Sequence, residues 1–305
     1  MIPSKLKKGD TIGIIAPSNS IQEDDKPYIE KSTSLFEDLG YKVKLGKHVY
    51  SNTLGYSASN LEKSEDINNM FADKNISAIF CVKGGCNSNS VFDYLDYDLI
   101  SNNPKILCGF SDSTSLTNVI TLKTGLVTFN GPTFKSLTSW ETDYSFKQVI
   151  KRFIDKSLDL GNIDDEFFTL YEGKAIGKLI GGNLSLTTQM VCGKYSLDFQ
   201  DKILFIEDLG YESEPTRISS YLYFMKQNGV FDKISGLWIG NYEHHSNISL
   251  EKIVLDTLGN NIKFPIIKSN NFGHIDKKTV IPIGTTACID TNKNTKIVLT
   301  EDCVF

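Results

Sequence analysis

The chain has 305 residues, of which 40% are hydrophobic and 23% are charged, and its formal net charge at pH 7 is −5. That length suggests about two globular domains, and the ordinary composition excludes collagen-like, disordered and disulfide-framed proteins. The acidic balance argues against nucleic acid as the main partner, because nucleic-acid binding needs a basic face.

The first part of the chain alternates between strand and helix patterns. Short runs typical of strands lie at 11–16, 41–45, 76–82, 106–110 and 126–129. Helical spacing of apolar residues separates them and covers 28–39, 60–73 and 113–123. Repeated β-α-β units with nearly continuous apolar strands predict a parallel sheet with helices on both faces.

The second part is interpreted as a separate domain. Residues 136–172 are rich in charge, show no clear strand, and are expected to connect an N-terminal domain (1–135) to a C-terminal domain (173–305). There, strands are predicted at 202–207, 234–240, 264–267, 286–290 and 296–300, and helices at 215–226 and 249–258. Glycines interrupt 175–184, which predicts a bent or barrel-like sheet.

The sequence also predicts a cytoplasmic protein with no membrane partner. No apolar run approaches the roughly 20 residues of a membrane-spanning helix, and the N-terminus does not have the pattern of a secretory signal. The six cysteines include no Cys-x-x-Cys pair. We interpret them as small hydrophobic side chains in a reducing compartment.

Small and polar residues follow three of the predicted parallel strands. These are Pro17-Ser18, Gly84-Gly85 and Ser111-Asp112. Ligands of open parallel sheets bind beyond the carboxyl ends of the strands. Three such ends that converge on one edge of the sheet would therefore form a site.

Ser111 lies in the sharpest of these signals, Cys-Gly-Phe-Ser-Asp-Ser-Thr at 108–114. A serine on a tight strand-to-helix turn presents its hydroxyl at the sheet edge, and the helix N-terminus offers amides for an oxyanion. The motif is not the hydrolase elbow Gly-x-Ser-x-Gly, because Ser113 stands where the second glycine is needed. The alternative is that Ser111, Asp112 or Ser113 only caps the helix.

Two further segments could contribute to the same chemistry. The glycine pair at 84–85 would let the backbone approach a ligand and present its amides, although it matches no phosphate-loop pattern and could be a plain turn. Glu207 and Asp208 end an apolar run, where a carboxylate is costly unless it is paired or lies at a cleft. The alternative is a pair of solvated carboxylates.

Histidine is scarce, with four in the chain. His274 follows Gly273 in a predicted loop and is a candidate base, with a structural histidine as the alternative. His244 and His245 are adjacent, and adjacent histidines usually point apart as metal ligands. No His-Glu-x-x-His pattern is present. We therefore expect neither a metal site nor a cofactor.

Taken together, these residues supply the parts of a serine nucleophile system. Ser111 would be the nucleophile, His274 the base and Glu207 the carboxylate. The backbone amides of Gly85 and Asp112 would complete an oxyanion hole. Such a triad is recognised by the roles of its members and not by their order along the chain.

The ordered motifs resemble those of a serine peptidase family, which comprises the L,D-carboxypeptidases (muramoyltetrapeptide carboxypeptidases) and the microcin C self-immunity proteins. The resemblance covers nearly the whole chain, with matches at 6–18, 84–85, 109–112, 181–184, 204–208 and 272–274. It implies the same roles for Ser111, Glu207 and His274 and the same two oxyanion amides. It also implies a flavodoxin-like N-terminal domain, a β-rich, swivelling-barrel-like C-terminal domain, a site between them, and a homodimer.

The resemblance leaves two subfamilies open. Gly-Gly-Cys-Asn-Ser-Asn at 84–89 resembles the immunity-type loop, with Cys86 where both subfamilies usually have tyrosine. The segment 136–173 is shorter than in immunity-type proteins, and Trp140 is its one tryptophan. That length, and the sequence at 207–218, favour the carboxypeptidases.

We therefore expect a serine carboxypeptidase that releases the C-terminal D-residue of a muropeptide in peptidoglycan recycling. Asn183, Lys83 and Trp140 are the candidate substrate contacts. One alternative is the same chemistry on a peptidyl or aminoacyl nucleotide, which would confer microcin immunity. An alternative of another class is a two-domain binding protein without catalysis.

Overall fold

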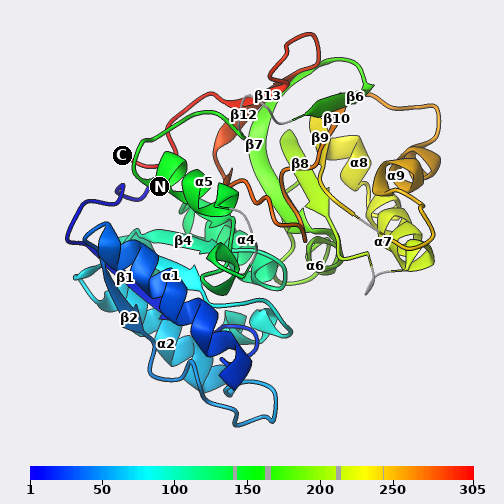
Figure 1. Cartoon of the computed structure of the whole chain (residues 1–305). Coiled ribbons are helices and arrows are strands. Elements are labelled where there is room, and N and C mark those ends of the chain that lie inside the picture. Colours follow the sequence, from blue (N-terminus) through cyan, green and yellow to red (C-terminus); the bar gives the residue numbers. More distant parts are fainter. Residues whose placement is uncertain (140–142, 162–165, 211–213, 243) are drawn as a thin grey trace.

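A computed structural model describes residues 1–139, 143–161, 166–210, 214–242 and 244–305. Two sheets share the molecule (Figure 1), and most of the chain up to Asn130 builds the first of them. No helix in these described ranges is both long enough and apolar enough to cross a membrane.

The first sheet is the predicted parallel sheet, with strands in the order β11-β5-β4-β3-β1-β2. Its strands are β1 (Thr11–Ile15), β2 (Lys42–Leu45), β3 (Ile76–Cys81), β4 (Ile106–Gly109), β5 (Thr128–Asn130) and β11 (Ile281–Ile283). The first five are parallel and follow the order 2-1-3-4-5, which is that of flavodoxin-like folds. The predicted fold class of this half is confirmed.

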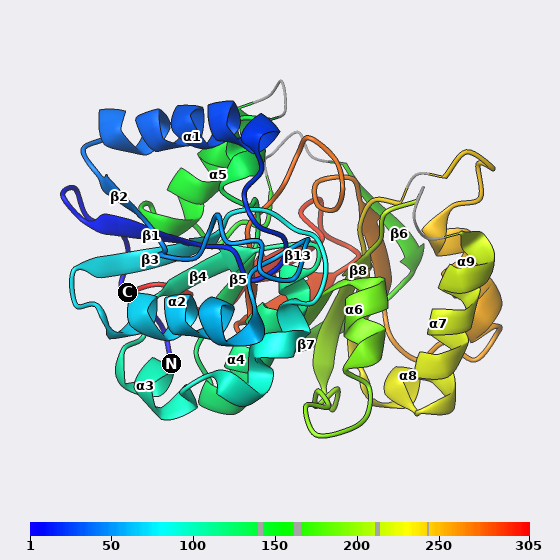
Figure 2. The ribbon, with the colours of Figure 1, turned by 90° about the horizontal axis from the view of Figure 1, so that it is seen from below.

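Helices cover both faces of this sheet, as Figure 2 shows. On one face lie α1 (Lys26–Asp38) and α5 (Tyr144–Phe153), and on the other lie α2 (Asn60–Ala72), α3 (Tyr97–Asn102) and α4 (Ser113–Thr124). Strands β1, β3 and β4 are buried almost throughout because both faces are covered, and their sequences are therefore nearly continuous apolar runs, whereas Lys42 and Lys44 of the edge strand β2 are exposed. Phe36 of α1, for example, contacts Phe80 of β3, with the ring centroids 5.8 Å apart.

The second sheet has the order β13-β12-β7-β8-β9-β10-β6. Its strands are β6 (Phe167–Tyr171), β7 (Lys174–Asn183), β8 (Lys202–Glu207), β9 (Gly236–Ile239), β10 (Ile266–Ser269), β12 (Thr286–Asp290) and β13 (Ile297–Leu299). It is curled, and its central four strands are parallel, whereas the three outer strands are antiparallel to their neighbours. Helices α6 (Leu184–Gln189), α7 (Pro215–Gln227), α8 (Val230–Lys233) and α9 (Leu250–Leu258) accompany it.

Two strands differ from the sequence-based expectation. Residues 136–172 were expected to lack a strand, yet Phe167–Tyr171 forms β6 at the sheet edge, antiparallel to β10. Ile281–Ile283 was not predicted as a strand, because it is short and contains Pro282. It forms β11, an edge strand beside β5 in the first sheet, where a proline is tolerated. The C-terminal part of the chain therefore completes the N-terminal sheet.

Helix α4 and strand β7 join the two halves. The Asn118 side chain donates to Gly181 O (2.8 Å) and accepts from Gly181 N (3.2 Å). Gly182 has a positive φ of 134°, and a Cβ there would lie 2.7 Å from Thr114 Oγ1. Thr114 Oγ1 also accepts a hydrogen bond from Asn183 N (3.1 Å). The glycines therefore permit the close approach that fixes the end of β7 against the start of α4.

Candidate active site

The turn between β4 and α4 holds Ser111 at the edge of the first sheet. Its φ is +61°, a left-handed conformation that few residues other than glycine adopt. Asp112 is the N-cap of α4, but its side chain makes no capping hydrogen bond within the described residues. The alternative that this motif only caps the helix is therefore not supported.

Asp112 instead links the three strand ends. Its Oδ2 accepts hydrogen bonds from Ser18 Oγ (2.5 Å), after β1, and from Ser88 N (2.8 Å), after β3. The Ser88 hydroxyl donates in turn to the backbone oxygen of Asp112 (2.6 Å). The predicted convergence of the strand ends is confirmed, and the sequence had not singled out Ser88.

Three side chains from both halves of the molecule meet beside this turn. His274 Nε2 lies 3.0 Å from Ser111 Oγ, and His274 Nδ1 lies 2.7 Å from Glu207 Oε2. The Glu207 side chain is 2% exposed and that of His274 is 14% exposed. An imidazole between a hydroxyl and a buried carboxylate can take a proton from the one while the other stabilises its charge.

The surroundings of Glu207 fix its position at the end of β8. Asn183 Nδ2 lies 3.4 Å from Glu207 Oε1 and 3.3 Å from Asp208 Oδ1. The Asn183 side-chain oxygen accepts from Leu186 N (3.3 Å) and so caps α6. Asn183 is therefore a buried support of the two carboxylates, a role that differs from the substrate contact expected from the sequence.

A glycine lets the His274 loop approach. Gly273 has a positive φ of 122°, and a Cβ there would lie 3.2 Å from Glu207 Oε2. On its other side, the His274 ring contacts Phe110, with centroids 5.2 Å apart. Lys278 Nζ lies 5.0 Å from the centroid of the same Phe110 ring. No local sequence pattern indicates this stack, because Phe110 and Lys278 come from opposite halves of the chain.

Charge around His274 favours its protonated form. Burial alone would lower the pKa of the imidazole, but the charge of Glu207 and its hydrogen bond outweigh burial, and the pKa is raised above 6.5. The ammonium of Lys278 acts in the opposite direction on the pKa of His274. Burial lowers the pKa of Lys278 itself to about 8.

The glycine pair after β3 lies over Ser111. A Cβ on Gly84 would be 3.1 Å from Ser111 Oγ, and a Cβ on Gly85 would be 2.4 Å from Asn19 Oδ1. Only glycine lets the backbone pass so close, and Gly85 has a positive φ of 140°. Across the described ranges, the backbone amides of Gly85 and Asp112 have no hydrogen-bond acceptor.

The two other predicted substrate contacts have different outcomes. Lys83 Nζ lies 2.6 Å from Asp25 Oδ2, and Lys135 Nζ lies 2.6 Å from Asp25 Oδ1. Lys83 is therefore part of a charge cluster and not an isolated cation. Trp140 lies outside the described residues.

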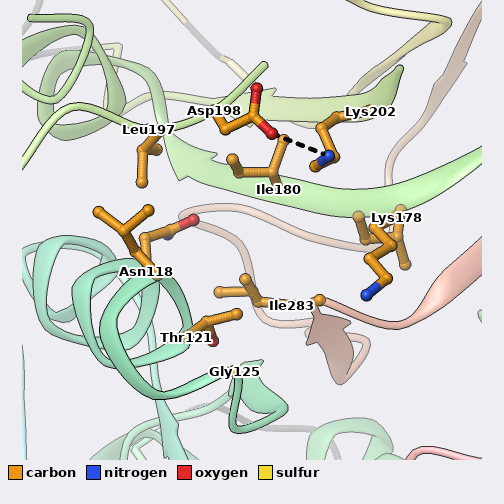
Figure 3. Close-up of a pocket in the computed structure, with 12 residues that line it drawn as sticks. Asn118, Thr121, Gly125, Lys178, Ile180, Leu197, Asp198, Lys202 and Ile283 are labelled. Atoms are coloured by element: carbon orange, nitrogen blue, oxygen red, sulfur yellow. Dashed lines mark hydrogen bonds and ion pairs between the residues drawn. The ribbon is translucent and has the colours of Figure 1, made fainter. Parts of the chain in front are cut away.

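Two pockets contrast in their chemistry. One of about 580 Å³ opens beside His274 and is lined by the loops after β8 and β9, with Asp208, Tyr242 and His244 among its polar groups. The other, of about 220 Å³, lies between α4 and β7 (Figure 3). It holds none of the three side chains that meet at Ser111, and Lys202 there is paired with Asp198 at 3.3 Å. The pocket beside His274 is the candidate substrate site.

Two family models match most of the chain. Residues 12–131 match the family described as the LD-carboxypeptidase N-terminal domain, and residues 176–289 match the LD-carboxypeptidase C-terminal domain. The chain is 32% identical over 308 residues to a probable murein peptide carboxypeptidase of Bacillus subtilis, with 97% of this chain and 93% of that protein covered.

Solved structures with the same fold cover 99% to 100% of the chain. A crystal structure of an MccF-like protein from Bacillus anthracis superposes with a TM-score of 0.84 at 30% identity, covering 99% of both chains. A mutant of the microcin C7 self-immunity protein MccF in complex with adenosine monophosphate gives a TM-score of 0.90 at 26% identity, covering 100% of both chains.

Proposed function

The chain belongs to the LD-carboxypeptidase family, and we propose that it is a serine carboxypeptidase that hydrolyses an L,D peptide bond and releases the C-terminal D-residue of a muropeptide. The observation that carries the proposal is the chain of short contacts from Ser111 through His274 to Glu207. In this proposal the enzyme is a cytoplasmic homodimer that acts in peptidoglycan recycling. The homodimer is tested by measuring the mass of the purified protein in solution.

In the first step, His274 Nε2 accepts the proton of Ser111 Oγ as this oxygen attacks the carbonyl carbon of the scissile bond. The carbonyl oxygen becomes an oxyanion. The amides of Gly85 and Asp112 are the donors proposed for it, since both flank Ser111 and neither has another acceptor in the described residues. Glu207 accepts the hydrogen bond from His274 Nδ1 and stabilises the imidazolium.

In the second step, the imidazolium gives its proton to the leaving nitrogen, and the D-residue departs as an amine. The remaining acyl group is an ester on Ser111. His274 then takes a proton from a water molecule, which attacks the ester, and the proton returns to Ser111 Oγ when the ester bond breaks. The chemistry needs no metal ion.

A terminal D-residue carries a free carboxylate, and a cation near Ser111 would bind it. Lys83 directly precedes Gly84, which lies against Ser111. Asp25 faces both Lys83 and Lys135, so that one carboxylate is shared between two ammonium groups and a formal charge of +1 remains. We therefore keep Lys83 as the proposed carboxylate contact and no longer propose Asn183 for this role.

The pH dependence of catalysis tests the role of Glu207. The base must be neutral, so kcat/KM should fall as the pH decreases through a His274 pKa that lies above 6.5. Glu207→Gln removes the charge that raises this pKa and leaves the burial that lowers it, so the acid limb should move to lower pH while kcat falls. The measurement is kcat/KM from pH 5 to 9 for both proteins.

Glu65→Gln is the control for that measurement, because Glu65 is an exposed glutamate beside another histidine, His48. Its pH profile should match that of the unmodified enzyme. If Glu207→Gln leaves the acid limb in place, His274 is not the base or Glu207 is not its partner.

The second candidate function is cleavage of a peptidyl or aminoacyl nucleotide, which the similarity to the nucleotide-bound self-immunity structure favours. The two are separated by kcat/KM on a muropeptide tetrapeptide and on an aminoacyl sulfamoyl adenosine. We expect the muropeptide to be preferred. A nucleotide base needs an aromatic surface, where stacking is worth roughly 1–3 kcal/mol, and Trp140 is the residue proposed for that role. A hundredfold preference for the adenosine compound that Trp140→Ala abolishes would establish the immunity-type activity instead.

A further inference from the structure

A buried lysine lies close to the loop after β3 and the turn before α4. Lys63 comes from the buried side of α2 and is only 2% exposed. An ammonium group is costly to bury unless the protein supplies partners for it, and burial lowers the pKa of Lys63. None of the proposed catalytic steps uses this charge directly, so its role must be sought in the groups around it.

The ammonium of Lys63 holds the loop that follows β3. Its Nζ donates to the backbone oxygen of Asn87 (3.1 Å), two residues after Gly85. Asn87 has a positive φ of 68°, a conformation that costs energy in residues other than glycine, and the hydroxyl of Ser90 donates to the same oxygen (2.7 Å). Gly85 supplies one of the two amides proposed for the oxyanion. Lys63 therefore fixes one end of the segment that presents this amide.

Asp112, which supplies the second of these amides, brings a buried carboxylate to the site. The residue is 4% exposed, and its Oδ2 accepts from two neutral groups, the hydroxyl of Ser18 and the amide of Ser88. A carboxylate here opposes the negative charge that develops on the oxyanion, because charges act strongly where water is excluded. The charges of Lys63 and Asp112 attract each other, although the two form no direct ion pair within the described ranges. The ammonium therefore offsets a charge that would slow the attack by Ser111.

We propose that Lys63 is a positioning residue of the oxyanion hole, which acts on the reaction through Gly85 and Asp112. Its hydrogen bond to Asn87 O holds the first amide in place, and its charge compensates the carboxylate beside the second. This role rests on the proposed serine mechanism, in which both amides bind the oxyanion. Because the oxyanion forms only when Ser111 attacks, Lys63 should contribute to kcat and hardly to substrate binding.

The test replaces Lys63 with methionine, an unbranched side chain without charge. Asn87 O keeps the hydroxyl of Ser90 as a donor, so the change leaves this carbonyl with a partner. Because loss of one oxyanion donor costs about 10²–10³ in kcat, Lys63→Met should lower kcat on the muropeptide by at least about tenfold and leave KM nearly unchanged. The rate at which a fluorophosphonate labels Ser111 should fall by a similar factor, since the phosphonyl oxygen is expected to bind the same amides.

Lys105→Met is the matched control, because Lys105 is also a buried lysine that donates to backbone oxygens. It is 6% exposed, and its Nζ lies 2.5 Å from both Asp73 O and Ile76 O. Lys105 directly precedes β4, whereas Ser111 follows the other end of that strand. Loss of buried hydrogen bonds should lower the melting temperature of Lys105→Met, but kcat and the labelling rate should match those of the unmodified enzyme.

A double-mutant cycle with Asp112→Asn separates charge compensation from a general loss of structure. Asparagine keeps an oxygen that can accept from Ser18 and Ser88, but it carries no charge. Lys63→Met should therefore lower the labelling rate less in the Asp112→Asn background than in the unmodified enzyme. All rates are measured below the melting temperature of the least stable variant, so that each refers to folded protein.

The proposal is overturned if Lys63→Met is labelled as fast as the unmodified enzyme, if Lys105→Met loses as much, or if the loss is the same in both Asp112 backgrounds. Labelling does not depend on the identity of the substrate. An enzyme that is labelled at Ser111 but does not cleave the muropeptide would refute the proposed substrate, and the labelling rates of the variants would still decide the role of Lys63.

Discussion

Ser111→Ala is expected to lower the turnover number by roughly four to six orders of magnitude, as the loss of the nucleophile does in other serine triads. The fold should survive. A hydroxyl at a helix start contributes about 1 kcal/mol, and alanine and serine face the same constraint at the positive φ of this residue. Turnover of the muropeptide and the melting temperature are the two measurements.

The matched control is Ser113→Ala, which removes a buried hydroxyl from the same turn, two residues further along. Its turnover should stay close to that of the unmodified enzyme. A fluorophosphonate should label Ser111 in the unmodified enzyme and in Ser113→Ala. Mass spectrometry should find no adduct on Ser111→Ala. If Ser111→Ala retained more than about a tenth of the activity, Ser111 would not be the nucleophile. An unlabelled native protein without turnover would favour the binding-protein alternative.

The parallel sheet was predictable because its strands β1, β3 and β4 are apolar on both faces, and β2 alternates as an edge strand does. Runs such as Ile76–Cys81 carry the signal within a few residues, and glycines follow α1 (Gly40) and α4 (Gly125). The edge strands β6 and β11 were not predicted, because they lack the features that mark the central strands. Each has one side without a neighbouring strand, is short, and owes its conformation to a partner strand from elsewhere in the chain. The residues of a strand carry no local signal for pairing with a distant partner strand.

The candidate site likewise contains residues that could be predicted from the sequence and contacts that could not. Ser111, Glu207 and His274 could be proposed from the sequence because each lies at or after the end of a strand and carries a reactive group, and strand ends meet at a sheet edge. The partners of Asn183 and Lys83 could not be predicted. Glu207 and Asp25 are distant from them in the sequence and contact them only in the folded chain. Both were chosen as polar residues near the cleft, and the structure shows that their polar atoms already bind carboxylates.

His274→Ala is expected to lower turnover by roughly as much as Ser111→Ala, and the double variant should be no slower than either single variant. The serine is a weak nucleophile without a base, and the base has no proton to take without the serine, so either change removes the same step. The structure couples them through the 3.0 Å contact between His274 Nε2 and Ser111 Oγ. Independent roles would instead multiply the two losses. The measurement is a double-mutant cycle of kcat/KM on the muropeptide.

His48→Ala serves as the control in this cycle, because that histidine follows the edge strand β2 and faces Glu62 and Glu65 instead of Ser111. It should keep full turnover and add nothing to the loss from Ser111→Ala. EDTA should leave turnover unchanged, since the proposed chemistry uses only side chains, backbone amides and water. Multiplicative losses in the double variant would show that His274 and Ser111 act separately. Loss of turnover in EDTA with recovery on added zinc would replace the serine mechanism with one that depends on a metal ion.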